Sequence, residues 1–461
     1  MESFLDRVRY DLDRLSRRSL QIWVEDATIT YLIARAAVGC GFRNITLVGG
    51  PAVKQARDAV EAHIGYNARV RALSPAVAVQ FRGRGDEATW IIDAGIAGCG
   101  RVIRKLATEG PVLYLARENG PAGGALVAGA YHPGCLDGLE LMPIRVSPVC
   151  GSLTAHLITW ALTLAGAMEA APPPSSCRMP LRPLAPGLSW PGVFEKPFTI
   201  LIPGGGGAIG HAFLDCLRQV PQFEEERSGH CQPLFDHPNA KFILVDPGVV
   251  HASAVSRQIF YSFAQARSAA PKAEATAAAL RRTFPRAETI TYNEAVSEAL
   301  FDRHPKIDFC VWSVDTWFAR RLLSRCCSER GIPFISAGSH HDGGMARLVH
   351  HRNQYCLPPE TGVEGLGNPA RQDPPGALAD RTSCAYRPAP SSILPNLAVA
   401  SHMVHMLLDH LAIADWDRVD PALAVSLARG VEVHLLRDSE EPGYERLRHS
   451  PGRLVSVRDP R

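Results

Sequence analysis

A short apolar strand that runs through a glycine-rich turn into a helix limits the fold of this chain more than any other feature. Residues 198–220 begin with the strand FTILI, continue through the turn PGGGG, and end in the helical pattern AIGHAFLDCLRQV. A strand followed directly by such a turn and a helix opens a βαβ unit. The second half of the chain is therefore expected to build an α/β sheet around this unit.

The same alternation continues after the turn. Apolar strands at 241–246, 308–315 and 332–338 are separated by helical patterns at 272–284 and 316–331. Successive parallel strands need a crossover, which is usually a helix, so this order predicts a mostly parallel, Rossmann-like sheet.

The N-terminal part repeats this plan in a weaker form. A strand is expected at 19–24, a helix at 27–41 and a strand at 43–50, and the helical stretch 147–166 resembles 391–411. We interpret the repeat as an internal duplication. A general α/β likeness without duplication is the alternative.

The clearest boundary is a proline-rich run at 171–192, which is expected to form an extended linker without a regular ladder. The predicted organisation is a first half at 1–170, a linker at 171–194, a second half at 195–435 and a solvated tail at 436–461.

Charge and cysteine usage exclude several classes of protein. Charged residues make up 21% of the 461 residues and the formal net charge is +3, which argues against nucleic acid and membrane surfaces as partners. The N-terminus lacks the apolar core of a signal peptide, and no apolar run has the roughly 18 residues of a membrane span. The twelve cysteines include no C-x-x-C pair, which argues against structural zinc. These features predict a soluble, cytoplasmic protein.

The glycine turn is a candidate phosphate site. Gly205, Gly207 and Gly210 form G-x-G-x-x-G, whose backbone amides and following helix N-terminus favour a phosphate. Asp246 ends the next strand and suits ribose hydroxyls. A tight turn without a ligand and an ordinary turn aspartate are the alternatives.

Four further side chains favour ATP over NAD. Arg257, Gln258 and Lys272 would place two cations and an amide near the turn, which suits a triphosphate. Asp315 follows a buried strand, at the ligand edge of a parallel sheet, where a carboxylate can hold Mg²⁺. Solvated helix-end charges, and a helix cap at Asp315, are the alternatives. In the first half, the acidic Glu25 stands where the second half has its glycine turn, so we expect no usual nucleotide site there.

These motifs resemble those of the ubiquitin-activating-enzyme superfamily, which includes the bacterial adenylyltransferases of thiamine and molybdopterin synthesis. The family signature is G-x-G-G-x-G, D-x-D, S-N-L-x-R-Q, K and a strand ending in D. This chain has GGGGAIG, VDPG, SAVSRQ, PKAEA and VWSVD in that order, and the likeness spans about two thirds of its length. The chain departs from the signature at Ala208, Gly248 and Ala254.

The resemblance implies roles for individual residues. It implies phosphate contacts by Gly205, Gly207, Gly210, Arg257 and Lys272, ribose binding by Asp246, and Mg²⁺ binding by Asp315, with Gln258 as the paired glutamine. It further implies that an inactive first half lends an arginine to the active half. Here RLSRR at 14–18 makes Arg17 the match, with an exposed basic helix end as the alternative.

The family often carries a thioester cysteine in a loop before its last helix. Cys384, in the segment RTSCAYRPAP, fits that context within a cysteine-bearing loop at about 356–393, and Cys356 is the second choice. Arg381 and Arg387 would favour the thiolate. An inert loop cysteine is the alternative.

The resemblance implies ATP- and Mg²⁺-dependent adenylation of the C-terminus of a ubiquitin-like carrier protein, followed by a thioester on Cys384 and transfer to a conjugating enzyme. Paired halves in one chain favour protein conjugation, and bacterial antiviral systems contain such two-half enzymes. Adenylation of a peptide or a sulfur-carrier protein, an NAD-dependent Rossmann oxidoreductase and a non-catalytic scaffold are the alternatives. A homodimer is left open.

Overall fold

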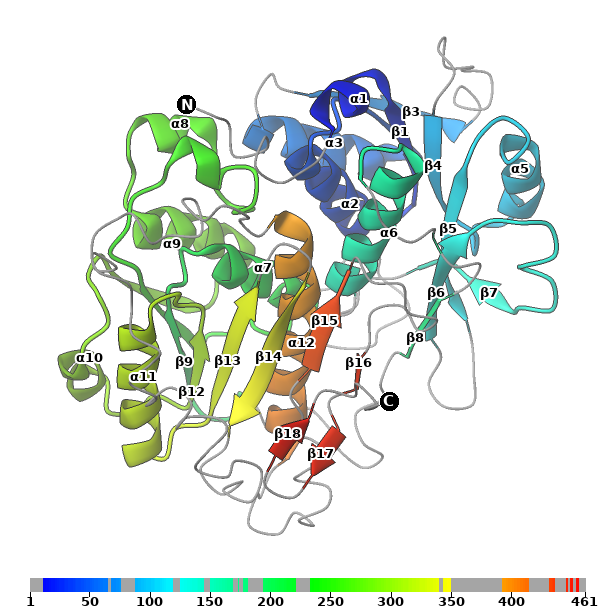
Figure 1. Cartoon of the computed structure of the whole chain (residues 1–461). Coiled ribbons are helices and arrows are strands. Elements are labelled where there is room, and N and C mark those ends of the chain that lie inside the picture. The colour runs from blue at the N-terminus through cyan, green and yellow to red at the C-terminus, as the bar shows by residue number, and fades with distance from the viewer. Residues whose placement is uncertain are drawn as a thin grey trace.

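Two mixed sheets, each covered by helices, lie side by side in the chain (Figure 1). The computed structural model describes residues 11–64, 68–75, 88–118, 125–144, 150–168, 173, 177–180, 194–220, 233–339, 343–349, 392–413, 431–435, 445–446, 448–450 and 453–455.

The first sheet has eight strands in the order β3-β2-β1-β4-β5-β6-β8, with β7 paired to β5. The strands from β3 to β5 are parallel, and β6, β7 and β8 pair antiparallel. The elements of this half are α1 (Leu12–Arg17), β1 (Ser19–Trp23), α2 (Ala27–Cys40), β2 (Asn44–Val48), α3 (Pro51–Ile64), β3 (Arg69–Leu73), β4 (Ala88–Asp93), α5 (Cys99–Leu106), β5 (Val112–Glu118), β6 (Ala125–Ala130), β7 (Leu141–Met142), α6 (Cys150–Leu164) and β8 (Cys177–Pro180).

The second sheet also has eight strands, in the order β11-β10-β9-β12-β13-β14-β15-β16. Its elements are β9 (Phe198–Pro203), α7 (Ala208–Leu217), β10 (Ala240–Val245), the 3₁₀ turn η3 (Ala252–Ala254), α8 (Phe263–Arg267), α9 (Lys272–Thr283), β11 (Glu288–Tyr292), α10 (Glu298–Arg303), β12 (Phe309–Trp312), α11 (Trp317–Glu329), β13 (Phe334–Ser339), β14 (Gly343–Val349), α12 (Ile393–Leu411), β15 (Val431–His434) and β16 (Glu445–Arg446). A separate hairpin joins β17 (Arg448–Ser450) to β18 (Arg453–Val455).

The two sheets share one plan. In each, five parallel strands with the Rossmann order 3-2-1-4-5 are followed by antiparallel strands at one edge. The predicted fold class, two mostly parallel Rossmann-like halves, is therefore confirmed.

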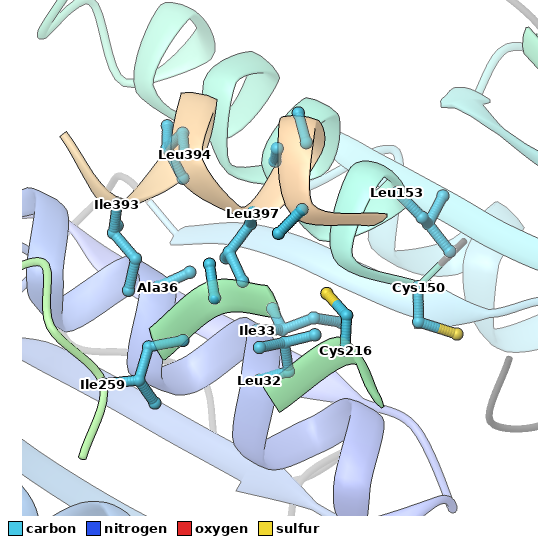
Figure 2. Close-up of a cluster of buried hydrophobic side chains, with 14 of the residues drawn as sticks. Leu32, Ile33, Ala36, Cys150, Leu153, Cys216, Ile259, Ile393, Leu394 and Leu397 are labelled. Atoms are coloured by element: carbon cyan, nitrogen blue, oxygen red, sulfur yellow. The ribbon is translucent and has the colours of Figure 1, made fainter. Parts of the chain in front are cut away.

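The core between the halves is made by four helices. α2 and α6 of the first half pack against α7 and α12 of the second. Figure 2 shows side chains from all four helices in one buried cluster, among them Ile33, Cys150, Cys216 and Leu397. α2 and α6 are apolar on nearly every side, which is expected of helices enclosed between two sheets.

Two segments behave differently from the sequence expectation. The proline-rich run that was predicted to lack a ladder contributes β8, which pairs antiparallel with β6. An edge strand needs hydrogen bonds on one side only, so a terminal proline is tolerated there. The predicted solvated tail contributes β16, which pairs with β15 and extends the second sheet. Within the described ranges, no helix has the length and apolarity that a membrane crossing requires.

Candidate nucleotide site

The glycine turn lies at the switch point of the second sheet. It leaves the carboxyl end of β9, whose neighbours are β10 on one side and β12 on the other. At a switch point, the connections that follow two neighbouring strands run to opposite sides of the sheet. This leaves a crevice at the carboxyl ends of the strands, where ligands of α/β sheets usually bind. The turn leads into α7, whose N-cap Gly207 has no side chain to cap the helix amides. A phosphate is the ligand that this arrangement favours.

Glycine is required in this turn by close backbone approaches. Gly204 has φ +71°, and a Cβ there would lie 2.7 Å from the Ser313 carbonyl oxygen. A Cβ on Gly210 would lie 2.8 Å from the Gly205 carbonyl oxygen. Both distances are too short for a side chain, so the turn depends on bare backbone.

Asp246 and Lys272 lie against the turn from the other side. A Cβ on Gly206 would lie 2.8 Å from Asp246 Oδ2 and 2.5 Å from Lys272 Cβ. Asp246 is buried and accepts a hydrogen bond from the Gly248 amide at 2.9 Å. Burial raises the pKa of Asp246. The positive charge of Lys272 opposes this rise in pKa, and the negative charge of Asp315 adds to it. Three of the predicted site residues are therefore electrostatic neighbours beside the turn.

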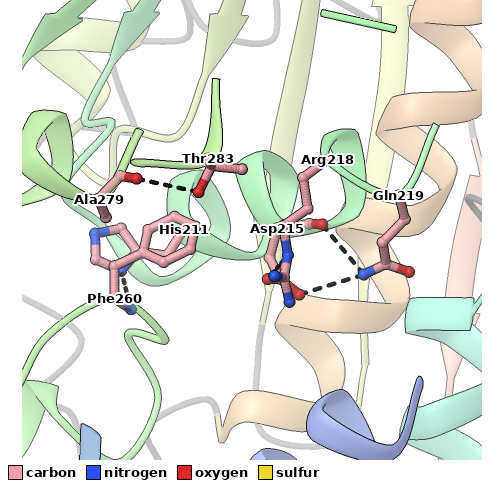
Figure 3. A network of polar contacts seen from close by, with 7 residues as sticks. All are labelled: His211, Asp215, Arg218, Gln219, Phe260, Ala279 and Thr283. Atoms are coloured by element: carbon pink, nitrogen blue, oxygen red, sulfur yellow. Dashed lines mark hydrogen bonds and ion pairs between the residues drawn. The ribbon is translucent and has the colours of Figure 1, made fainter. Parts of the chain in front are cut away.

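A buried polar cluster joins the turn to α9, and sequence reasoning missed it. The Tyr261 hydroxyl lies 3.1 Å from the carbonyl oxygens of both Gly206 and Lys272, and 3.1 Å from Thr276 Oγ1. His211 Nδ1 accepts from the Phe260 amide at 3.2 Å, and Figure 3 shows the two rings side by side. The Nε2–H of His211 therefore donates to Thr276 Oγ1 at 2.9 Å. Burial, then Lys272 and Arg35, lower the pKa of His211, which keeps the ring neutral. A histidine inside the largely apolar sequence of α7 was the available signal.

Asp315 follows β12 at the same edge of the sheet. Ser313 Oγ donates to the carbonyl oxygens of Pro203 and Gly204 at 3.0 and 2.8 Å, which ties this strand exit to the turn. The cap of α11 is Thr316, whose hydroxyl accepts from the Ala319 amide, so Asp315 does not cap the helix. The Asp315 side chain is exposed and makes no ion pair within the described part of the chain. Its carboxylate is thus available to a cation.

Arg257 and Gln258 are buried, which excludes the alternative of a solvated charge at Arg257. Their amides donate to the Ala254 carbonyl oxygen at 3.1 and 2.8 Å. The buried Gln258 Oε1 has no hydrogen-bond donor among the residues whose positions are defined. Residues 254–261, the segment that carries both side chains, lie between α7 and α2.

Arg17, Cys384 and Cys356 are the remaining predicted residues. Arg17 is the last residue of α1 and is exposed, and it forms no hydrogen bond or ion pair with the described residues. Cys384 and Cys356 lie outside the described residues. The roles of all three stay predictions.

The residues present fit a magnesium–nucleotide ligand. The turn is built of glycines at which a Cβ would clash with neighbouring backbone, and α7 begins with amides that no side chain caps. Lys272 makes no ion pair inside the described ranges, and Asp315 is an exposed oxygen donor, the kind that Mg²⁺ prefers.

The corresponding place in the first half is already filled. The Asp26 carboxylate caps α2 by accepting from the Thr28 and Ile29 amides at 2.8 and 3.0 Å. Asp93, which ends β4, is buried and accepts from the Gly95 and Ile144 amides. Burial raises the pKa of Asp93 to about 7. A carboxylate of the chain itself thus occupies the helix N-terminus where a phosphate would bind.

Two sheets of one Rossmann plan, with a glycine turn at one switch point, define an α/β protein with two Rossmann-like halves, a fold in which nucleotides commonly bind at the switch point. Residues 239–410 match the ThiF family. This part of the second half is therefore similar to the ThiF family, in agreement with the resemblance of the sequence motifs to the E1-like adenylyltransferase superfamily.

Individual relatives cover parts of the chain. Adenylyltransferase and sulfurtransferase MOCS3 of Mus musculus is 32% identical over 130 residues, which are 26% of this chain and 27% of that protein. The chain thus spans about a quarter of this curated relative. A crystal structure of E. coli MccB is 15% identical with a TM-score of 0.37, over 58% of this chain and 70% of MccB. MccB with succinimide is 15% identical with a TM-score of 0.36, over 55% and 66%.

Proposed function

We propose that this chain activates a carboxylate by transferring AMP to it from Mg–ATP. The observation that carries the proposal is the glycine turn at Gly204–Gly210, against which Asp246, Lys272 and the strand exit before Asp315 all pack. The turn suits a phosphate, Asp246 suits a ribose, and Lys272 and Asp315 supply a cation and an exposed carboxylate. This combination suits a nucleoside triphosphate better than a dinucleotide.

The chemistry is an attack of the carboxylate oxygen on the α-phosphorus. A bond forms between that oxygen and phosphorus, the bond to the bridging oxygen breaks, and pyrophosphate leaves with its negative charge. Lys272 and Arg257 would offset the charge on the phosphates, and Asp246 would hold the ribose. Mg²⁺, held by Asp315, would withdraw charge from the leaving group.

The substrate that we propose is the C-terminal carboxylate of a ubiquitin-like carrier protein. The Cys384 thiolate would then attack the adenylated carbonyl, releasing AMP and forming a thioester for transfer to a conjugating enzyme. Two halves within one chain support this choice, since the first half adds protein surface beside the site for a carrier to contact.

The test is ATP–pyrophosphate exchange with candidate carriers in the intact chain. Asp315→Ala is expected to abolish exchange, and Cys384→Ala to keep exchange but form no thioester. Asp302→Ala, an exposed carboxylate of α10 that pairs with Arg330, is the matched control. Exchange that survives Asp315→Ala would remove the role of Asp315, and nicotinamide binding without ATP binding would instead favour an oxidoreductase.

A second candidate is adenylation of a sulfur-carrier protein. It is favoured by the relative from Mus musculus, whose name includes both adenylyltransferase and sulfurtransferase. Exchange supported by a sulfur carrier, with no thioester on the enzyme, would separate it from the first candidate.

A further inference from the structure

The segment that carries Arg257 and Gln258 packs directly on α2 of the first half. Figure 2 places Ile259 of this segment in the same buried cluster as Leu32, Ile33 and Ala36 of α2. Two residues on one face of α2, Arg35 and Gly39, lie against the backbone of the segment. Their spacing of four residues puts them one above the other along the helix.

Arg35 donates to the backbone of the segment. Its side chain is 1% exposed, and Nη2 donates to the Val255 carbonyl oxygen at 2.5 Å. Within the described residues Arg35 Nε has no acceptor, and burial lowers the pKa of the guanidinium. Burying a cation costs desolvation free energy, so buried cations are usually hydrogen-bonded to a defined acceptor. Here the acceptor stands two residues before Arg257.

Gly39 lets the segment lie on the helix. A Cβ at this position would lie 2.5 Å from the Ser256 carbonyl oxygen and 3.2 Å from Ile393 Cγ2. Real Cβ atoms do not approach a backbone oxygen so closely, and the oxygen cannot rotate away as a flexible side chain would. Any residue larger than glycine would therefore push Ser256, the neighbour of Arg257.

The other end of the segment is fixed to the glycine turn. The Phe260 amide donates to His211 of α7, and the Tyr261 hydroxyl contacts the Gly206 carbonyl oxygen. Arg257 and Gln258 thus lie between two anchors, one in the first half and one beside the phosphate turn. A displacement at either anchor moves both side chains relative to the turn.

We propose that α2 of the first half positions Arg257 and Gln258 for the nucleotide phosphates through Arg35 and Gly39. The inference rests on the proposed function above. It makes the first half a positioning element of the second half's site, through residues of α2 rather than through Arg17. Arg35 acts through the backbone at Val255 and is a positioning residue.

The sharpest test replaces Gly39 by alanine in the full chain. Alanine is the better helix former, so α2 itself is not weakened, and the added methyl acts on Ser256. The matched control is Gly100→Ala in α5, where a Cβ has no neighbour within 4 Å. Gly39→Ala is expected to weaken ATP binding and raise the ATP KM roughly 10-fold to 100-fold, the scale of an ångström misplacement, with a smaller change in kcat. Gly100→Ala is expected to match the wild type.

Arg35 is tested by Arg35→Met and Arg35→Lys. Methionine removes the donor to Val255, whereas lysine keeps a cationic donor, so Lys is expected to restore part of the ATP affinity that Met loses. Arg218→Met is the structural comparator, because Arg218 lies at the same interface but pairs with Asp215 and stacks on Tyr31. It is expected to lower the melting temperature without changing the nucleotide affinity of the folded protein.

Amide hydrogen exchange gives a readout that needs no nucleotide. The Gln258 amide, which donates to Ala254, is expected to exchange faster in Gly39→Ala and Arg35→Met than in Gly100→Ala. Unchanged exchange at Gln258 together with wild-type ATP affinity in both variants would overturn the inference, whatever happens to the melting temperature. If the wild type binds no ATP, the proposed function fails, and exchange at Gln258 still decides whether α2 positions the segment.

Discussion

The Tyr261 hydroxyl provides the clearest measurable link between the glycine turn and α9. Replacing Tyr261 by phenylalanine removes one oxygen and leaves the buried ring in place. The Lys272 carbonyl oxygen keeps its bond from Thr276 Oγ1 at 2.8 Å, so the Gly206 carbonyl oxygen is the acceptor that loses a donor. Losing one neutral hydrogen bond and leaving a buried carbonyl unsatisfied costs about 1–3 kcal/mol. Because that carbonyl belongs to the turn, the cost falls on the conformation that binds phosphate.

The expected result of Tyr261→Phe is an ATP dissociation constant raised between about fivefold and about a hundredfold, since 1.4 kcal/mol corresponds to a factor of ten. Isothermal titration with Mg–ATP measures it. Tyr114→Phe, a fully buried tyrosine of β5 in the first half, is the matched control and should bind ATP as the wild type does. Equal ATP affinity in the wild type and in Tyr261→Phe would refute the reasoning that this hydroxyl holds the turn.

Three further predictions concern charge. Asp315→Asn should abolish pyrophosphate exchange while metal-free ATP still binds, as measured by titration in EDTA. Arg218→Met should lower stability by about 3–5 kcal/mol, because it leaves the fully buried Asp215 without its ion pair, and urea unfolding measures this. Asp93 has a folded pKa of about 7, above its ordinary value, so its contribution to stability is full below about pH 4 and is lost as the pH rises through 7. Asp93→Asn should remove up to about 3 kcal/mol of the pH dependence of the unfolding free energy between pH 5 and 8, as measured by urea unfolding.

Each of these predictions has an opposing outcome. Retained exchange in Asp315→Asn would mean that another group holds the metal. A urea midpoint unchanged by Arg218→Met would mean that the pair with Asp215 contributes nothing net. Parallel pH profiles for the wild type and Asp93→Asn would show that Asp93 does not titrate in this range.

The fold was predictable because its signals are local. The strand at 198–202, the turn at 203–207 and the helix from Ala208 can be recognised from apolar periodicity and glycine alone, and the structure has them in those places. β8 was not predictable, because its pairing with β6 joins segments about fifty residues apart, and prolines hide an edge strand.

The positions of the candidate site residues were predictable only where these residues follow strand ends. Asp246 and Asp315 come directly after β10 and shortly after β12, so parallel topology alone brings them to one edge. The hydrogen bonds among His211, Tyr261 and Thr276 join three segments that no local pattern relates. The anchoring of Val255 by Arg35 crosses 220 positions of sequence, and a lone arginine inside an apolar helix does not reveal its acceptor.

The cap of α2 by Asp26 has a consequence for stoichiometry. A chain built from two copies of one phosphate-binding plan would be expected to take up two nucleotides. Here one copy supplies its own anion at the helix N-terminus, and the other leaves those amides open. Saturation should therefore be reached at one nucleotide per polypeptide, because the Asp26 carboxylate already satisfies the helix N-terminus of the first half.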